Sequence, residues 1–183
     1  MTAGHQQAAG RLDRALAGLQ AGTVGVLNML LWLGVCSVWR REDFWISPNL
    51  MADAFSPSAA FHTGFAWSTA FGVALYILLY GALGTLFALA AGRPMPRLRL
   101  ALVAMAFSLG WYLGWYWIIF RWLWRAAPLA ALLHGGRAAV YGHLMYGALL
   151  GGFPRYLPKP VAPETVPPVA EEKAEVQSET STD

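Results

Sequence analysis

Four long apolar runs, nearly free of ionisable side chains, alternate with polar or mixed connections along this chain. They cover residues 16–39, 67–91, 98–121 and 137–153. A helix of about 20 apolar residues can cross the ~30 Å hydrocarbon core of a bilayer. Within lipid such a helix satisfies its own backbone hydrogen bonds. The pattern therefore predicts an all-α, polytopic integral membrane protein with four transmembrane helices.

The predicted membrane domain covers residues 16–153 and has a segment on each side of it. Residues 1–15 form a polar N-terminal segment, and residues 154–183 form a tail rich in proline, glutamate, serine and threonine. The tail carries too little apolar surface to pay for folding, so we expect it to be disordered. Its last part, residues 161–183, has a charge balance of −5 and is strongly acidic.

The connection between the first two runs, residues 40–66, is rich in aromatic and aliphatic side chains. Ser47-Pro48 and Ser56-Pro57 each resemble a helix N-cap followed by proline in the first helical position. They predict one or two short interfacial helices in this outer loop. Pro128 predicts a similar short helix in the other outer loop, between the third and fourth runs.

Composition agrees with a membrane location, since 57% of residues are hydrophobic and 13% are charged. Soluble domains average about 25% charged residues, and a charge at mid-membrane costs at least ~2.5 kcal/mol on insertion scales. The arginines stand at the ends of the apolar runs rather than on one exposed face. We therefore expect membrane lipids as partners, and no nucleic acid.

The basic side chains also indicate orientation. With the N-terminus inside, the inner side holds eight of them: Arg11, Arg14, Arg93, Arg97, Arg99, Arg155, Lys159 and Lys173. The outer side holds five: Arg40, Arg41, Arg121, Arg125 and Arg137. Because Lys and Arg in short loops favour the cytoplasmic side, both termini are predicted to be cytoplasmic.

Glycine spacing predicts where helices pack closely. Three pairs of glycines stand four residues apart: Gly18/Gly22, Gly110/Gly114 and Gly147/Gly151. Such pairs let a second backbone approach, either from the same chain or from another one. Tyr80-Gly81-Ala82-Leu83-Gly84 and Tyr146-Gly147-Ala148-Leu149-Leu150-Gly151 also resemble each other. This likeness indicates either two related helical hairpins or a chance similarity between glycine-rich helices.

Aromatic and histidine side chains gather near the outer end of the predicted bundle. Trp111 and Trp115 lie deeper than an interfacial aromatic belt explains. They predict core packing, a wall for a lipid, quinone or pigment, or contact with a protein partner. His143 is the one ionisable residue well inside a predicted span. It is either a candidate site residue or a neutral histidine hydrogen-bonded to a neighbouring tyrosine or carbonyl. His62 lies in the first outer loop.

The sequence has little that predicts catalysis. Two histidines could ligate haem and three could hold zinc, but no paired spacing supports either, so we expect no cofactor and no metal. No catalytic triad or phosphate-loop pattern is present. The outer carboxylates Glu42 and Asp43 stand beside Arg40 and Arg41, which predicts surface ion pairs. Coupled carriers place acids or broken helices at mid-membrane. The four runs contain no Asp or Glu, and four helices are few for such a carrier, which leaves a homo-oligomeric channel as the open transport role.

Two segments, residues 143–151 and 44–50, carry a resemblance to a known family. Their sixteen residues, HLMYGALLG and FWISPNL, resemble small bacterial four-helix inner-membrane proteins of the YagU-like kind. The resemblance implies a location in the bacterial cytoplasmic membrane. It implies no activity, and it assigns no functional residues.

Taken together, these patterns predict a non-enzymatic accessory or structural membrane protein that associates with itself or with another membrane protein. The alternative is a binder or conduit for a small amphiphile or an ion, built on the outer Trp/His region. Its candidate residues are His143, Trp111, Trp115 and His62. Co-purification of a partner would favour the first role, and a bound haem, pigment or quinone would favour the second.

Overall fold

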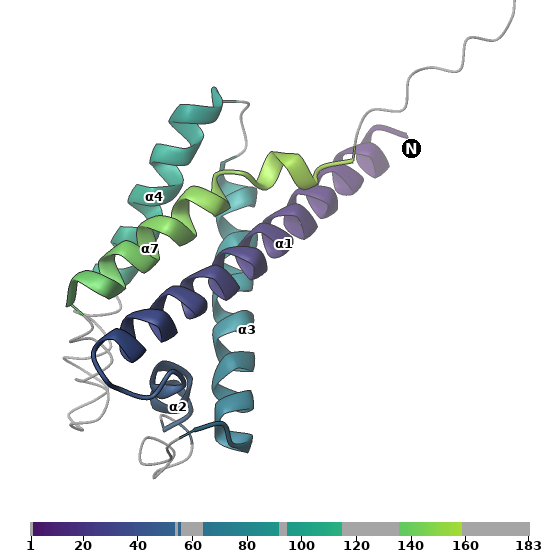
Figure 1. Cartoon of the computed structure of the whole chain (residues 1–183). Helices are drawn as coiled ribbons and strands as arrows, with labels where there is room; N and C mark the ends of the chain where they lie inside the picture. The colour runs from purple at the N-terminus through teal and green to yellow at the C-terminus, as the bar shows by residue number, and fades with distance from the viewer. Residues whose placement is uncertain (1, 54, 56–63, 92–94, 115–135, 159–183) are drawn as a thin grey trace, which may run out of the picture.

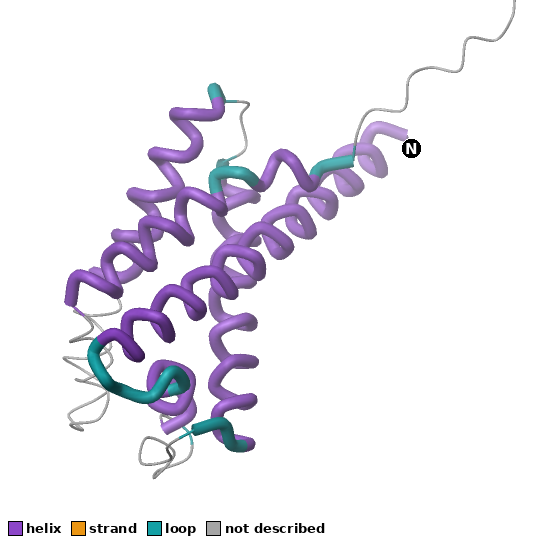
Figure 2. Tube along the Cα trace, in the orientation of Figure 1, coloured by secondary structure: helices purple, strands orange, loops and turns teal. Residues whose placement is uncertain are grey.

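The computed structural model describes residues 2–53, 55, 64–91, 95–114 and 136–158. Every regular element within these residues is helical, and they contain no strand (Figure 2). The elements are α1 (Thr2–Trp39), α2 (Ile46–Asp53), α3 (Trp67–Ala90), α4 (Arg97–Gly114), α7 (Gly136–Leu150) and the short 3-10 helix η3 (Phe153–Tyr156). The all-α class predicted from the sequence is confirmed.

Two of the described helices are long and apolar enough to cross a membrane by length and composition: α1 between Gly10 and Trp39, and α3. Of the other two predicted spans, the third is only partly described and the fourth is described in full. α4 ends at Gly114 in the described chain, and the rest of the run predicted to reach residue 121 lies outside it. α7 has 15 residues and ends at Leu150, before η3 begins.

Within the described residues, the four long helices form two pairs, and the two pairs pack against each other (Figure 1). α1 crosses α3, and α4 lies beside α7. α7 also packs on α1, which joins the pairs. The core between them is aromatic and aliphatic, and its buried members include Val26, Met29, Tyr76, Tyr80, Leu83, Phe87, Tyr146 and Leu150. The sequence has therefore folded as two helical hairpins around one core.

Glycines allow the closest helix contacts in both pairs. A Cβ on Gly18 of α1 would lie 2.5 Å from the Gly84 carbonyl oxygen of α3, and one on Gly22 would lie 2.6 Å from the Tyr80 carbonyl oxygen. In the other pair, a Cβ on Gly147 of α7 would lie 2.5 Å from the Cα of Met105 on α4. No side chain fits at these positions without moving a backbone. The glycines thus fix how α1 meets α3 and how α7 meets α4.

The loop after α1 folds back onto α3 through α2. α2 begins at Ile46, one residue before the predicted cap, and buries Pro48 and Leu50. Asp43 precedes it, and its carboxylate accepts hydrogen bonds from the backbone N–H groups of Trp45 (2.7 Å) and Gly64 (2.6 Å). α2 packs against α3, so its buried residues face protein. The second short helix predicted at Ser56-Pro57, and the one at Pro128, lie outside the described residues.

The ordered chain extends further at both ends than hydropathy predicted. α1 begins at Thr2, so residues 2–15 of the predicted N-terminal segment continue the first span as one helix. At the other end η3 covers Phe153–Tyr156, with Phe153 buried, so the chain is still ordered where the tail was predicted to begin at residue 154. The rest of the predicted tail, residues 159–183, lies outside the described residues.

Candidate functional site

His143 on α7 is the polar centre of the described core, where it is 6% exposed. Its Nδ1 lies 2.8 Å from the carbonyl oxygen of Ala139, one turn earlier on the same helix. Its Nε2 lies 2.7 Å from the hydroxyl oxygen of Tyr80 on α3. Both ring nitrogens therefore have a hydrogen-bond partner inside the protein.

These two bonds fix the tautomer of His143, because a carbonyl oxygen can only accept. Nδ1 carries the proton that is donated to Ala139, and Nε2 of the neutral ring accepts the Tyr80 O–H. A metal or haem iron would need the lone pair on a ring nitrogen, and the bond to Tyr80 already uses it. In this arrangement His143 joins α7 to α3 and presents no free nitrogen to a ligand.

Tyr80 connects the histidine to a second buried tyrosine. The Tyr146 O–H donates to the backbone carbonyl oxygen of Tyr80 at 2.7 Å, and the two rings meet edge to face with centroids 5.0 Å apart. Tyr146 has no exposed surface, and its ring lies against Gly25 of α1, where a Cβ would lie 2.8 Å from it. Tyr80 and Tyr146 open the two similar glycine-rich segments, so equivalent positions of the apparent repeat meet at the centre.

α4 completes the cluster with three side chains. Trp111 is partly buried and packs against the core that contains Tyr80. The Tyr112 ring lies 4.6 Å from the His143 ring, centroid to centroid. Ser108 is buried and donates to the His143 backbone carbonyl oxygen at 2.7 Å. We call these residues the tyrosine–histidine cluster: Tyr80, Ser108, Trp111, Tyr112, His143 and Tyr146.

The cluster coincides in part with the Trp/His region predicted from the sequence. It brings His143 and Trp111 together through Tyr80, whereas Trp115 and His62 lie outside the described residues. Two tyrosines lie close to His143 along α7: Tyr146 is buried, whereas Tyr141 is 55% exposed. The tyrosine that bonds to His143 is Tyr80 of α3, which was not predicted from the sequence. Its position in the first glycine-rich segment, matching Tyr146 in the second, was the available signal.

The chemistry of the cluster favours bonding between helices over catalysis. Its functional groups are phenol, imidazole, indole and hydroxyl, and none of its members is a carboxylate. Among the described residues, no group of three or more His, Cys, Asp or Glu side chains could hold a metal ion. Two carboxylates of the outer loop are engaged elsewhere: Glu42 pairs with Arg40 at 3.1 Å, and Asp43 accepts hydrogen bonds from backbone N–H groups.

The third glycine pair has different surroundings from the other two. A Cβ on Gly110 or Gly114 of α4 would have no atom of the described neighbouring elements within 4 Å. Gly110 lies on the side of α4 opposite to Ala104 and Ser108, which are buried. We call this side the exposed face of α4; its exposed members are Leu102, Val103, Ala106, Gly110 and Leu113.

Comparison with known protein families, with curated proteins and with solved structures gave no match. The resemblance of residues 143–151 and 44–50 to YagU-like membrane proteins therefore stays a prediction.

Proposed function

We propose that this chain is a four-span protein of the bacterial cytoplasmic membrane, with both termini in the cytoplasm and no catalytic activity of its own. Its role is to associate through the exposed face of α4 with another transmembrane helix, in a second copy or in a different membrane protein. The apolar helices α1 and α3 support the membrane location. The packing of α7 on α1 and of α4 on α7 supports two further spans.

The contrast among the three glycine pairs carries this proposal. Gly18/Gly22 and Gly147/Gly151 lie against a neighbouring helix of the same chain. Gly110 and Gly114 have the same spacing, but no described atom of another element lies within 4 Å of their added Cβ positions. Packing within the described chain therefore accounts for two pairs and leaves the third open to a second chain.

The physics of helix association in lipid explains why such a face would be used. Lipid tails are as apolar as leucine, so helices associate through close van der Waals packing where small residues let backbones approach. Ala106, Gly110 and Gly114 stand four residues apart, and exposed Leu102, Val103 and Leu113 flank them. This arrangement offers a flat strip between larger side chains, which suits a second helix.

The proposal is tested by co-capture of two differently tagged copies in mild detergent. We expect Gly110→Leu to lower the captured fraction about tenfold, the equivalent of ~1.4 kcal/mol, because the added side chain separates the backbones. In the same purification, a different membrane protein that accompanies the wild type should be lost from this variant. Thermal unfolding should not change, since a Cβ on Gly110 meets no described atom.

Ala82→Leu is the matched control, because Ala82 is a small exposed residue on α3 rather than on α4. It adds similar bulk at a different exposed position, so it should leave co-capture at the wild-type level. The proposal fails when Gly110→Leu captures the second copy, or any membrane partner, as well as the wild type does. It also fails when Ala82→Leu lowers capture to the same extent.

A further inference from the structure

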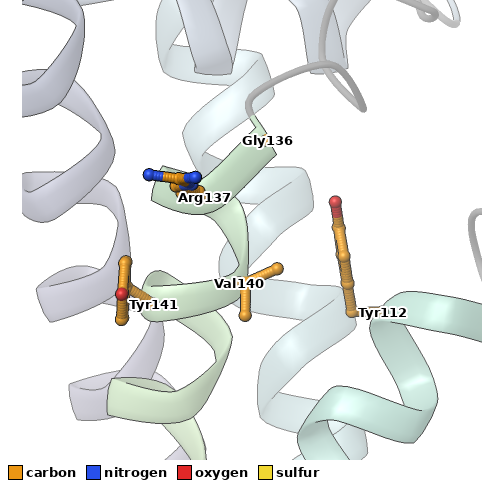
Figure 3. A pocket seen from close by; sticks show the side chains of 5 residues that line it. All are labelled: Tyr112, Gly136, Arg137, Val140 and Tyr141. Atoms are coloured by element: carbon orange, nitrogen blue, oxygen red, sulfur yellow. The ribbon is translucent and has the colours of Figure 1, made fainter.

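A second feature lies where α4 ends and α7 begins, at the end of the α4–α7 pair. The helix surfaces there leave a hollow of about 420 Å³. Tyr112 of α4 lines one part of it, and four residues of α7 line the rest: Gly136, Arg137, Val140 and Tyr141 (Figure 3). Tyr112 lies on the side of α4 that meets His143, so the hollow is distinct from the exposed face of α4.

The lining combines one cation, two phenols and an aliphatic side chain. Arg137 and Tyr141 stand one turn apart along α7, and Val140 points toward Tyr112 (Figure 3). Arg137 is exposed, and no carboxylate of the described residues lies within 4.0 Å of its guanidinium. The hollow thus carries a positive charge that the described chain does not neutralise, beside aromatic surface.

The length of α7 determines how deep this charge lies. Its 15 residues extend ~22 Å at 1.5 Å per residue, which is shorter than the ~30 Å hydrocarbon core. In the four-span arrangement, Arg137 in the first turn of α7 therefore lies near the boundary between hydrocarbon and headgroups. An arginine at that depth is stabilised by extending its side chain to the phosphates of the interface.

We propose that the hollow binds the phosphate-bearing headgroup of an anionic phospholipid. Arg137 pairs with the phosphate, and the hydroxyls of Tyr112 and Tyr141 lie against the polar part of the lipid. A guanidinium offers two parallel N–H donors to a phosphate, and tyrosine suits the interface because it has an apolar ring and a polar tip. This inference rests on the proposed membrane location, but it is independent of association through α4.

A phospholipid fits the lining better than a free anion does. The hollow has a single cation, whereas its other surfaces are aromatic, aliphatic or glycine backbone. A small hydrated anion gains little from such surfaces, but the glycerol and the first acyl carbons of a lipid can bury against them. The lipid chains would then continue along the apolar sides of α4 and α7.

The test uses the full-length protein purified in detergent and two lipids with the same acyl chains, phosphatidylglycerol and phosphatidylcholine. Retained lipid is counted by native mass spectrometry, and the unfolding temperature is followed with each lipid. We expect the wild type to retain phosphatidylglycerol about fivefold better, the effect of one cation at an anionic surface. Arg137→Gln should abolish the preference, and Arg137→Lys should keep part of it.

Arg40→Gln is the matched control, since Arg40 is an outer arginine that already pairs with Glu42 at 3.1 Å; it should leave the preference unchanged. Equal retention of both lipids by the wild type overturns the proposal without any variant. Unchanged preference in Arg137→Gln overturns it as well, and so does equal stabilisation by inorganic phosphate. Extraction of the wild type from membranes by alkali would instead refute the membrane location itself, and with it the proposed function.

Discussion

His143 has both ring nitrogens bonded within the protein, to the Ala139 carbonyl oxygen and to the Tyr80 hydroxyl. A bonded pair of polar groups in a dry core costs little, whereas one left without its partner carries a desolvation penalty of about 1–3 kcal/mol. The stability contribution of His143 is therefore inseparable from that of Tyr80. Substitutions at either position have to be interpreted as changes to the pair.

Substituting His143 should distinguish a structural histidine from a ligand. His143→Gln should change the free energy of unfolding by no more than ~1 kcal/mol, because an amide keeps one donor and one acceptor. His143→Leu should cost about 1–3 kcal/mol, because the buried Tyr80 hydroxyl loses its acceptor. Unfolding of the purified variants in detergent, followed by circular dichroism, measures both.

The control is Tyr80→Phe combined with His143→Leu. Because this double variant removes both partners, it should recover part of the stability lost in His143→Leu alone. A ligand role would give a different result. A Soret band or stoichiometric zinc in the wild type, lost in His143→Gln, would contradict the structural reading of this residue.

The sequence predicted the kind of partner that His143 has, but not which tyrosine it would be. Ala139 lies one turn before His143 on the same helix, so a local pattern can suggest it. Tyr80 lies 63 residues away, and only the packing of α3 against α7 brings it close. Helical spacing along α7 favoured Tyr146, three residues after His143, but its hydroxyl donates to the Tyr80 carbonyl oxygen instead. A local pattern has no information on which of several tyrosines a distant helix contributes.

At the scale of the elements, identical glycine spacing has different consequences in different helices. Gly22 and Gly147 each meet a neighbouring backbone, whereas Gly110 meets no described element. The sequence predicted close packing at all three pairs without saying which would face another chain. Which pair faces another chain depends on how each helix is rotated about its own axis. Packing against the other helices determines that rotation.

The internal glycines should tolerate bulk poorly. A Cβ on Gly147 would lie 2.5 Å from the Cα of Met105, so Gly147→Leu must push α7 away from α4. Overpacking of this kind costs typically ~1–3 kcal/mol, and we expect a lower unfolding temperature and a broader elution peak on sizing in detergent. Gly110→Leu is the control, because it adds the same side chain at a glycine whose Cβ would meet no described atom, and its unfolding temperature should not change. Wild-type unfolding of Gly147→Leu would mean that α4 and α7 do not pack as described.

The end of a helix agrees with the end of the apolar run in the sequence where a helix-breaking glycine or proline follows that run. α3 spans Trp67–Ala90, against 67–91 predicted, because Gly92-Arg93-Pro94 follows it. α1 starts at Thr2 rather than at residue 16. The segment 2–15 contains alanine, glutamine, arginine and leucine, which are good helix formers, so the helix continues through it. Hydropathy locates the apolar part of a helix, and it does not locate the end of the helix when no breaker is present.

For the whole molecule, the two helix pairs share one pattern of assembly. In each pair the second helix, α3 or α7, uses a Tyr-Gly-Ala-Leu segment to approach the first, and the tyrosines of the two segments meet. The likeness of the two segments therefore extends to their part in helix packing, and a true internal repeat stays a prediction. The positions of the hairpins relative to a membrane follow from the arginine distribution, and they stay a prediction.

Topology can be measured with reporter fusions along the chain. Fusions after residues 94 and 183 should report the cytoplasm, and one after residue 55 should report the outer side, because basic residues favour the inner side eight to five. The measurement is a pair of reporters active on opposite sides of the membrane. A cytoplasmic signal at 94 together with an outer signal at 183 would show that α4 and α7 do not both cross.

The most direct test of association through α4 is photocrosslinking in native membranes. A benzophenone is attached to Leu113→Cys, whose side chain is 48% exposed on the exposed face of α4, or to Leu78→Cys on α3, which is 71% exposed. Cys36 is the only native cysteine and is replaced by alanine in both. We predict a discrete protein adduct from position 113, of dimer mass for self-association, and lipid labelling alone from position 78. Association through the exposed face of α4 would be contradicted if the probe at position 113 gave no protein adduct, or if the probe at position 78 gave protein adducts equally often.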